Sequence, residues 1–279
     1  MTVHSVAQLG FNTATEHYDR SRPSYQPVAL SYIRRAVESP QQINVVERVL
    51  PFTLIGAGSG LFTKAFIAHP EWKDAFKELK AIEPSPGMRT VFTQTLSDER
   101  VSINEGTFDH TGIADGWADL VVIAQAFHWS PDFDQSAKEI GRILKPGGVL
   151  ALIWNLEDRE TAQWVAQVRD TIEKFEQGTP QYRHGLWRRV FQTEGYRASF
   201  EPPQEKTWSY ALQATKDTVL DRAFSKSYMT LLSDEKKAQT RADLSAVIDK
   251  GKGRVWVNED EGIFEYPYKT DVVIARRRA

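Results

Sequence analysis

The chain has 279 residues, enough for one large α/β domain or two modest ones, and its 41% hydrophobic and 26% charged residues are ordinary for a globular protein with a sizeable core. Its 35 lysines and arginines nearly balance its 37 acidic residues, so the formal net charge of −2 gives no support to a nucleic-acid-binding protein. The absence of cysteine excludes disulfides, thiolate metal sites and a cysteine nucleophile.

No segment of the sequence has the pattern of a secretory signal or of a membrane-spanning helix. The longest apolar stretches, Leu120–Ala124 and Val149–Trp154, are far too short to cross a bilayer. We therefore expect a cytosolic protein that has neither a membrane nor a nucleic-acid partner.

The first 50 residues contain a segment in which aromatic side chains alternate with arginines. This segment covers residues 11–25, and Pro23 and Pro27 interrupt any single long helix there. Two interpretations fit equally well: a lid over a ligand site, or a surface segment whose aromatic side chains pin it to the core. From Pro27 onward the apolar spacing predicts a helix that leads towards the first strand.

A glycine-rich segment follows an apolar run at residues 51–55. Three glycines stand at alternate positions in Gly56–Gly60, which predicts a strand, a tight turn and a helix that ends near Pro70. A dinucleotide-binding loop has its third glycine where this chain has Leu61, and a phosphate-binding P-loop has lysine directly after its last glycine. The spacing fits neither of these loops, and a plain turn is the simplest alternative.

The second predicted strand, Glu78–Glu83, ends in an acidic residue before a proline-rich turn. Glu83 stands about 20 residues after the glycines, where a ribose-binding carboxylate belongs. A carboxylate accepts hydrogen bonds from both ribose hydroxyls, whereas a strand-end glutamate is more usually a solvated charge. After the third predicted strand, Val101–Asn104, the pair Phe108 and Asp109 would hold an adenine ring by stacking and accept from its amino group.

The next two strands are the most apolar of the chain. Asp119–Ala124 predicts a buried fourth strand, and Val149–Trp154 predicts a fifth. Between them, Phe133–Lys145 has the periodicity of an amphipathic helix, and Pro146–Gly148 would end it. Strands that alternate with helices of this length predict a parallel sheet with right-handed crossovers.

The regular alternation of strands and helices changes after residue 155. Helices are predicted at 161–176, at 182–193 and in two stretches of 215–250, and strands at 206–210, 265–268 and 271–276. The sequence shows neither internal repeats nor low-complexity linkers, so we expect one domain.

Four motifs in order give the chain a family resemblance. The alternate glycines, Leu144–Leu150 (LKPGGVL), Ala126–Trp129 (AFHW), and Tyr18 with Arg22–Tyr25 (RPSY) resemble those of class I S-adenosylmethionine-dependent methyltransferases. The last two are similar to the subgroup of fungal small-molecule and trans-aconitate methyltransferases. The resemblance covers roughly residues 10 to 155.

This resemblance implies a doubly wound, seven-stranded, mostly parallel Rossmann-like sheet, with a helical cap inserted near the C-terminal strands. The single domain, residues 1–279, would comprise a lid and helix (1–50), a cofactor-binding core (51–155), and the cap with final antiparallel strands (156–279). The implied cofactor is S-adenosyl-L-methionine. The residues expected to bind it are Tyr18, Arg22, Tyr25, Gly56, Ala57, Gly58, Ser59, Gly60, Glu83, Pro84, Met88, Phe108, Asp109, Gln125, Ala126 and Phe127.

The sequence says less about the residues that would bind the methyl acceptor. His128 is the candidate general base, because its ordinary pKa lies near neutrality, and its alternative is a structural role beside Trp129. Trp129, Trp154 and Tyr228 are candidates for the substrate pocket. The histidines show no metal-ligand spacing, so we expect no metal.

One residue departs from the family pattern. The family usually carries an acidic residue two positions before the first glycine, and this chain has Leu54. The sequence therefore predicts methyl transfer from S-adenosylmethionine to a small organic acceptor, through a carboxylate, hydroxyl, thiol or amine, by a monomer or homodimer. A methyltransferase fold repurposed for non-methylating chemistry or regulation is the main alternative, and an RNA or protein methyltransferase is a further one.

Overall fold

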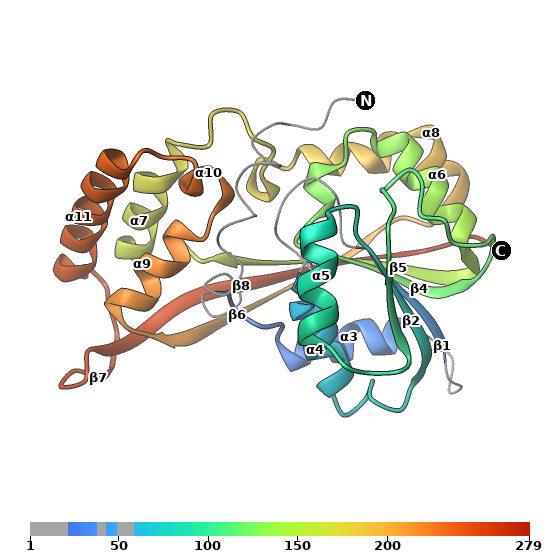
Figure 1. The fold of residues 1–279 in the computed structure, drawn as a ribbon, viewed down its shortest axis with the longest axis horizontal. Helices are drawn as coiled ribbons and strands as arrows, with labels where there is room; N and C mark the ends of the chain where they lie inside the picture. The colour runs from blue at the N-terminus through green and yellow to red at the C-terminus, as the bar shows by residue number, and fades with distance from the viewer. Residues whose placement is uncertain (1–21, 38–42, 49–58) are drawn as a thin grey trace. The chain divides into compact units, whose positions relative to one another are not determined.

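The computed structural model describes residues 22–37, 43–48 and 59–279. Their strands form one sheet in the order β3-β2-β1-β4-β5-β8-β6, with β7 paired to β8 (Figure 1). The strands are β1 Ile43–Arg48, β2 Phe76–Ile82, β3 Val101–Asn104, β4 Ala118–Ala124, β5 Leu144–Glu157, β6 Gln204–Ala214, β7 Trp256–Asn258 and β8 Ile263–Arg276. The α-helices are α3 Pro27–Ala36, α4 Leu61–Ala68, α5 Pro86–Thr95, α6 Phe133–Ile143, α7 Gln163–Glu173, α8 Glu194–Ser199, α9 Lys216–Phe224, α10 Ser227–Thr230 and α11 Asp234–Lys250.

The first half of the sheet is parallel. β1 pairs with β2 on one side and β4 on the other, β2 pairs with β3, and β4 pairs with β5, all in parallel. β7 and β8 form an antiparallel pair. Parallel strands joined through helices define an α/β, Rossmann-like fold with a mostly parallel sheet, as the sequence predicted.

The first strand lies earlier than the sequence pattern indicated. Ile43–Arg48 occupies the central position between β2 and β4, with Val45 fully buried, whereas the apolar run 51–55 that predicted this strand lies outside the described residues. The stretch Ile43-Asn44-Val45-Val46 has the β-branched content that suits a strand covered on both faces.

The contacts group the described residues into two compact units, where the sequence predicted one domain. The sheet unit contains the described residues of 24–154, together with 180–207 and 271–279. The helical unit contains residues 22–23, 155–179 and 208–270. The boundary falls inside β5, β6 and β8, so each of these strands contributes residues to both units.

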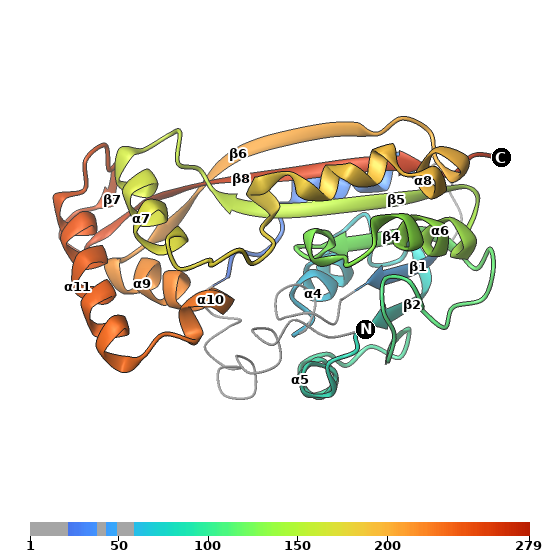
Figure 2. The same cartoon turned by 90° about the horizontal axis from the view of Figure 1, so that it is seen from above.

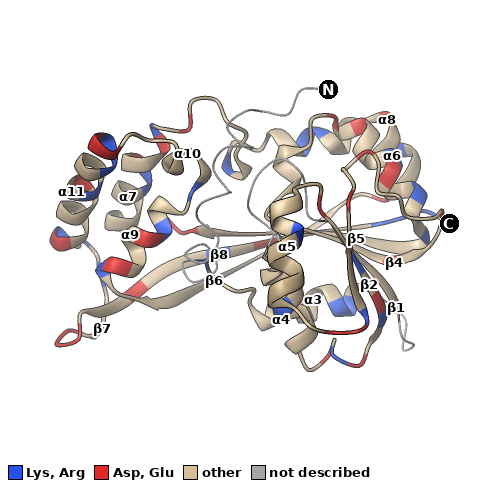
Figure 3. Ribbon diagram, viewed as in Figure 1, with Lys and Arg blue, Asp and Glu red and all other residues tan. Residues whose placement is uncertain are grey.

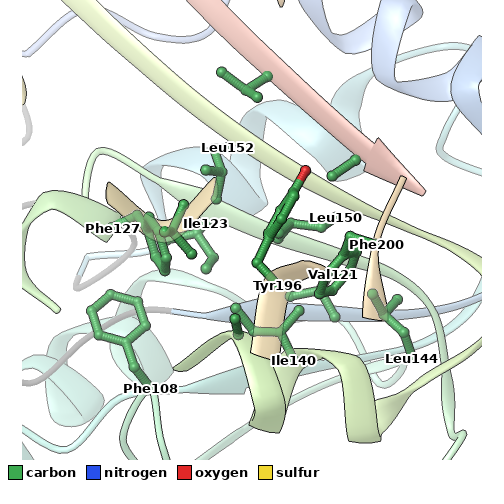
Figure 4. Packing of buried hydrophobic residues seen from close by; sticks show 14 of the residues in the cluster. Phe108, Val121, Ile123, Phe127, Ile140, Leu144, Leu150, Leu152, Tyr196 and Phe200 are labelled. Carbon is green, nitrogen blue, oxygen red and sulfur yellow. The ribbon is translucent and has the colours of Figure 1, made fainter. Parts of the chain in front are cut away.

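The core of the sheet unit joins α6 to the two most apolar strands. Ile140 of α6 packs with Val121 of β4 and Leu150 of β5, and Tyr196 of α8 closes the same cluster (Figure 4). α6 and α8 lie side by side (Figure 2). Asp132 begins α6 by accepting from the backbone N–H groups of its first turn, which satisfies donors that have no partner within the helix.

The helical unit has a core of its own. α7, α9, α10 and α11 gather together (Figure 1), and Trp164, Met229 and Leu244 are fully buried among them with Tyr268 of β8. Among the described residues, no helix is long and apolar enough to cross a membrane.

Among the elements of the C-terminal half that differ from the sequence prediction are one helix and one strand. The helix expected at 182–193 is divided into two 3₁₀ segments, Tyr182–His184 and Leu186–Gln192, because Gly185 between them adopts a left-handed φ of +68°. The two strand-like stretches 265–268 and 271–276 form one continuous strand, β8.

Candidate functional site

The glycine-rich turn is described from Ser59 onward. Gly60 begins α4 with a φ of +80°, the left-handed region that favours glycine. A Cβ at this position would also lie 2.7 Å from Leu96 Cδ1, the end of a flexible side chain beyond α5, so the left-handed φ is the main structural reason for this glycine. Ser59 is 2% exposed, and its Oγ finds no hydrogen-bond partner among the described residues. A buried hydroxyl without a partner is unusual in a folded protein and points to a polar ligand at this turn.

Glu83 follows β2 directly and is 1% exposed. Its Oε1 accepts from the backbone N–H of Ser85 at 2.8 Å, and its backbone carbonyl accepts from Arg89 Nη1 at 2.7 Å. Burial raises the pKa of Glu83 from its ordinary 4.5 to about 8, against the lowering effects of the Ser85 N–H and the Arg89 charge. A buried carboxyl group at the carboxyl end of a parallel strand is placed to accept hydrogen bonds from ligand hydroxyls.

Other predicted residues near Glu83 serve the local structure. Ser85 begins α5 and its Oγ accepts from the backbone N–H of Met88, whose side chain is buried, while Pro84 is half-buried. Phe108 is 1% exposed and meets Phe127 edge to face, with the ring centroids 5.5 Å apart (Figure 4). In this conformation the Phe108 ring belongs to the core of the sheet unit, and its role as a stacking platform for adenine stays a prediction.

Asp109 keeps part of its surface accessible. Its Oδ1 accepts a hydrogen bond from Thr107 Oγ1 at 2.6 Å, so one carboxylate oxygen is held by its own loop. Asp109 therefore remains a candidate acceptor for a ligand amino group.

The backbone turns sharply where β4 ends. Gln125 has a φ of +55°, rare for a residue with a side chain, and its N–H donates to the Ile153 carbonyl of β5 at 2.8 Å. Strained positions of this kind concentrate at functional sites. Ala126 and Phe127 follow, both buried, so at this turn only Gln125 among the three predicted residues keeps surface accessible.

His128 is bonded to a residue that the sequence placed in the pocket. Trp154 Nε1 donates to His128 Nδ1 at 3.3 Å, and burial lowers the pKa of His128 from 6.5 to about 3. The imidazole still keeps part of its surface accessible, and its ring centroid lies 5.4 Å from that of Trp129. The indole N–H of Trp129 is buried and has no hydrogen-bond partner among the described residues.

Trp154 itself is fully buried and does not line an open pocket. Its indole stacks on Tyr182 with ring centroids 4.5 Å apart, and Trp187 lies at the same centroid distance. The Tyr182 hydroxyl donates to Asp271 of β8 at 2.8 Å. In this conformation the Trp154 ring is buried and is bonded to His128, and its contact with substrate stays a prediction.

The remaining predicted residues lie apart from this group or outside the described part. Tyr25 is 5% exposed and packs edge to face on Phe62 of α4, which fits the interpretation that aromatic residues pin this segment to the core. Arg22, in the helical unit, donates to the Ser225 carbonyl at 3.0 Å. Tyr228 lines a cavity of about 210 Å³ that lies wholly within the helical unit. Residues outside the description are Tyr18, Leu54, Gly56, Ala57 and Gly58.

Sequence reasoning missed two kinds of residue. Ser85 and Arg89 hold the backbone around Glu83, and a serine three residues before Met88 at a helix start is a signal that could have identified the cap. Tyr182 and Asp271 fix Trp154 from positions far along the chain, and nothing in their local sequence indicates this. Within the described residues, no cluster of three or more histidines and acidic residues could hold a metal ion.

Comparisons with known proteins find similarity to methyltransferases. Residues 54–152 match the model of a methyltransferase domain. An uncharacterised methyltransferase-like protein of Schizosaccharomyces pombe is 27% identical over 238 residues, which are 85% of each chain. An uncharacterised methyltransferase of Mycobacterium bovis is 32% identical over 164 residues, which are 59% of each chain, so the match spans about three fifths of that relative.

Solved structures show the same fold at low sequence identity. The YcgJ protein of Bacillus subtilis has a TM-score of 0.55 and 15% identity, with 91% of this chain and 100% of that chain covered. A putative methyltransferase of Bacillus halodurans has a TM-score of 0.52 and 16% identity, with 90% and 99% covered.

Proposed function

The domain match and the methyltransferase relatives support an S-adenosylmethionine-dependent methyltransferase, and from this premise we propose that the protein methylates a small organic molecule. The observation that carries the proposal is that two polar groups of the matched domain are buried, one just ahead of α4 and one at the end of β2. Ser59 Oγ has no partner among the described residues, and the Glu83 carboxyl lies buried within the same matched domain.

The described residues fit the cofactor S-adenosyl-L-methionine. The Glu83 carboxyl would accept from the ribose hydroxyls, since Oε1 has one backbone donor and the group retains further lone pairs. Ser59 would offer its hydroxyl to the polar part of the molecule beside the glycine-rich turn. The bound cofactor supplies an electrophilic methyl group on a sulfonium.

The residues of the chain would then contribute by positioning the reactants and by keeping water out of the site. Ala126, Phe127 and Trp129 are buried around the turn after β4, and apolar groups there exclude water from a site built at the carboxyl ends of β2 and β4. Methyl transfer is a displacement at the methyl carbon, and alignment of the acceptor with the methyl group would supply most of its rate acceleration. A carboxylate acceptor needs no general base, whereas a hydroxyl or amine acceptor has a proton to lose.

A small acceptor agrees better with the chain than a nucleic acid does. The net charge of −2 gives no basic excess with which to bind phosphates. We further propose that the protein acts in the cytosol as a monomer or homodimer. The likeness to the fungal and trans-aconitate subgroup, from its Arg22–Tyr25 and Ala126–Trp129 motifs, stays part of this proposal.

Two measurements test the function. Isothermal calorimetry should show that S-adenosylhomocysteine binds and that NAD does not, and tight NAD binding without a response to S-adenosylhomocysteine would overturn the proposal. Incubation with S-adenosylmethionine labelled on the methyl group and a metabolite extract should then yield a labelled small product. If the label appeared only in protein or RNA, the acceptor would be a macromolecule and not a small molecule.

A further inference from the structure

The hydrogen bond between Trp154 and His128 determines which imidazole nitrogen carries a proton. An indole N–H is a donor only, and it lies 3.3 Å from His128 Nδ1. His128 Nδ1 must therefore present a lone pair, and in the neutral ring the proton is then on Nε2. Among the described residues no further hydrogen bond reaches His128, so Nε2 keeps its N–H for another molecule.

The indole that sets this tautomer is itself held rigidly. Tyr182 and Trp187 both contact the Trp154 ring with centroids 4.5 Å away. Tyr182 is anchored at two atoms: its hydroxyl donates to Asp271 Oδ2 at 2.8 Å, and its carbonyl accepts from Trp187 Nε1 at 3.1 Å. Because Trp154 is fully buried in this stack, its N–H has one direction in which to donate.

We propose that Trp154 is a positioning residue that holds His128 as the Nε2–H tautomer, so that the imidazole donates a hydrogen bond to the substrate and does not act as its base. The proposal rests on the proposed function, because it concerns the acceptor side of the same site. The imidazole of His128, just after the end of β4, thus presents an N–H donor, which suits a substrate group that carries free lone pairs.

The proposal separates two roles that the sequence leaves open. A general base needs a lone pair within reach of the proton that it removes. In the Nε2–H tautomer the one imidazole lone pair is already used by Trp154. Burial, which lowers the pKa of His128, keeps the ring neutral and so keeps this tautomer over the physiological pH range.

The tautomer can be observed directly. In protein labelled with ¹⁵N-histidine, long-range ¹H–¹⁵N correlation spectra distinguish a protonated ring nitrogen from one with a lone pair, and His128→Gln identifies the His128 signals. Wild-type protein should show His128 as Nε2–H with a hydrogen-bonded Nδ1 between pH 5 and pH 8. An Nδ1–H tautomer, or an imidazolium within that range, would overturn the proposal.

Variants then test the role of Trp154. Trp154→Phe keeps a buried ring but removes the N–H, so the Nδ1 signal should move towards that of a free lone pair and the Nδ1–H form should become populated. Trp187→Phe is the matched control, because it changes the same stack but leaves the Trp154 N–H in place, and it should keep the wild-type signals. Unchanged His128 signals in Trp154→Phe would overturn the proposal. If that variant does not fold, the wild-type spectrum decides by itself.

Calorimetry with S-adenosylhomocysteine keeps the two proposals distinguishable. Trp154→Phe should bind this ligand within about twofold of wild type, since His128 is assigned to the acceptor side. A wild-type protein that shows the Nε2–H tautomer but no binding would refute the proposed function and leave the tautomer assignment standing.

Discussion

At the scale of single residues, Glu83 is a carboxyl group that is almost completely removed from water. Burial raises its pKa to about 8, so between about pH 4.5 and pH 8 the folded protein holds a proton that the unfolded chain has released. The free energy of unfolding should therefore fall as the pH rises through this window. Glu83→Gln should lose this part of the pH dependence, which denaturant unfolding at several pH values measures. An identical pH profile for both proteins would contradict the assignment.

The same carboxyl group links cofactor binding to protons. Donation from ribose hydroxyls favours the ionised form, so S-adenosylhomocysteine should displace a proton from Glu83 near pH 7. Calorimetry in phosphate and in Tris should then give binding enthalpies that differ with the ionisation enthalpy of the buffer. Glu83→Gln should remove that difference, and Glu83→Ala should weaken binding by about 1.5–3 kcal/mol. If Glu83→Ala bound S-adenosylhomocysteine as tightly as the wild type, the assignment of Glu83 to the ribose would be wrong.

Gly60 allows backbone strain to be separated from packing. Gly60→Ala should destabilise the protein by about 1–2 kcal/mol from its left-handed φ, and by more because the new Cβ meets Leu96. Gly112→Ala is the matched control, since Gly112 has a φ of +71° and a Cβ added there would meet no atom within 4 Å. Denaturant unfolding should rank Gly60→Ala as clearly less stable than Gly112→Ala. Equal losses would show that the contact with Leu96 is relieved at no cost.

At the scale of elements, the sequence was informative where a segment's own pattern decides its structure. The strand Val101–Asn104 has the predicted bounds, and β4 differs from its prediction by one residue. The helix at 182–193 was mispredicted because the apolar spacing continues across Gly185, whose conformation interrupts it. The bond between His128 and Trp154 joins residues 26 apart and could not be predicted, because it depends on the register of β4 beside β5.

The end of β5 and the helix α9 are joined by a buried ion pair in the helical unit. Glu157 is 2% exposed, with Arg222 Nη2 3.0 Å from its Oε1 and Lys226 Nζ 3.1 Å from its Oε2. Burial lowers the pKa of Lys226 from 10.5 to about 8, which the Glu157 charge only partly opposes. Two buried cations thus depend on one carboxylate for compensation.

Neutralising that carboxylate should be costly. Glu157→Gln should lower the free energy of unfolding by about 3–5 kcal/mol, because Arg222 and Lys226 would remain buried without their counter-charge. Glu160→Gln is the control, since the Glu160 side chain is 79% exposed and its pair with Lys269 is worth at most about 1 kcal/mol. Denaturant unfolding compares the two variants. A loss no larger in Glu157→Gln than in Glu160→Gln would contradict this account.

At the scale of the whole molecule, charge argues against nucleic acid. Basic and acidic residues are both present on the helices of the helical unit (Figure 3), and the chain as a whole carries a formal charge of −2. We expect binding to a labelled RNA no tighter than a Kd of about 10⁻⁴ M at physiological salt. Electrophoretic mobility shifts would measure this, and a tight complex that weakens steeply with added salt would reinstate the RNA alternative.

The division inside β5, β6 and β8 limits how this protein can be truncated and how its units can be exchanged. The chain crosses from one unit to the other at 23/24, 154/155, 179/180, 207/208 and 270/271. A truncation before residue 271 would leave the residues of the helical unit in place but would deprive the sheet unit of its share of β8. The helical unit therefore cannot be deleted or exchanged as one contiguous segment: 155–179 and 208–270 must be replaced together, in register with β5, β6 and β8, and the unit also includes residues 22–23.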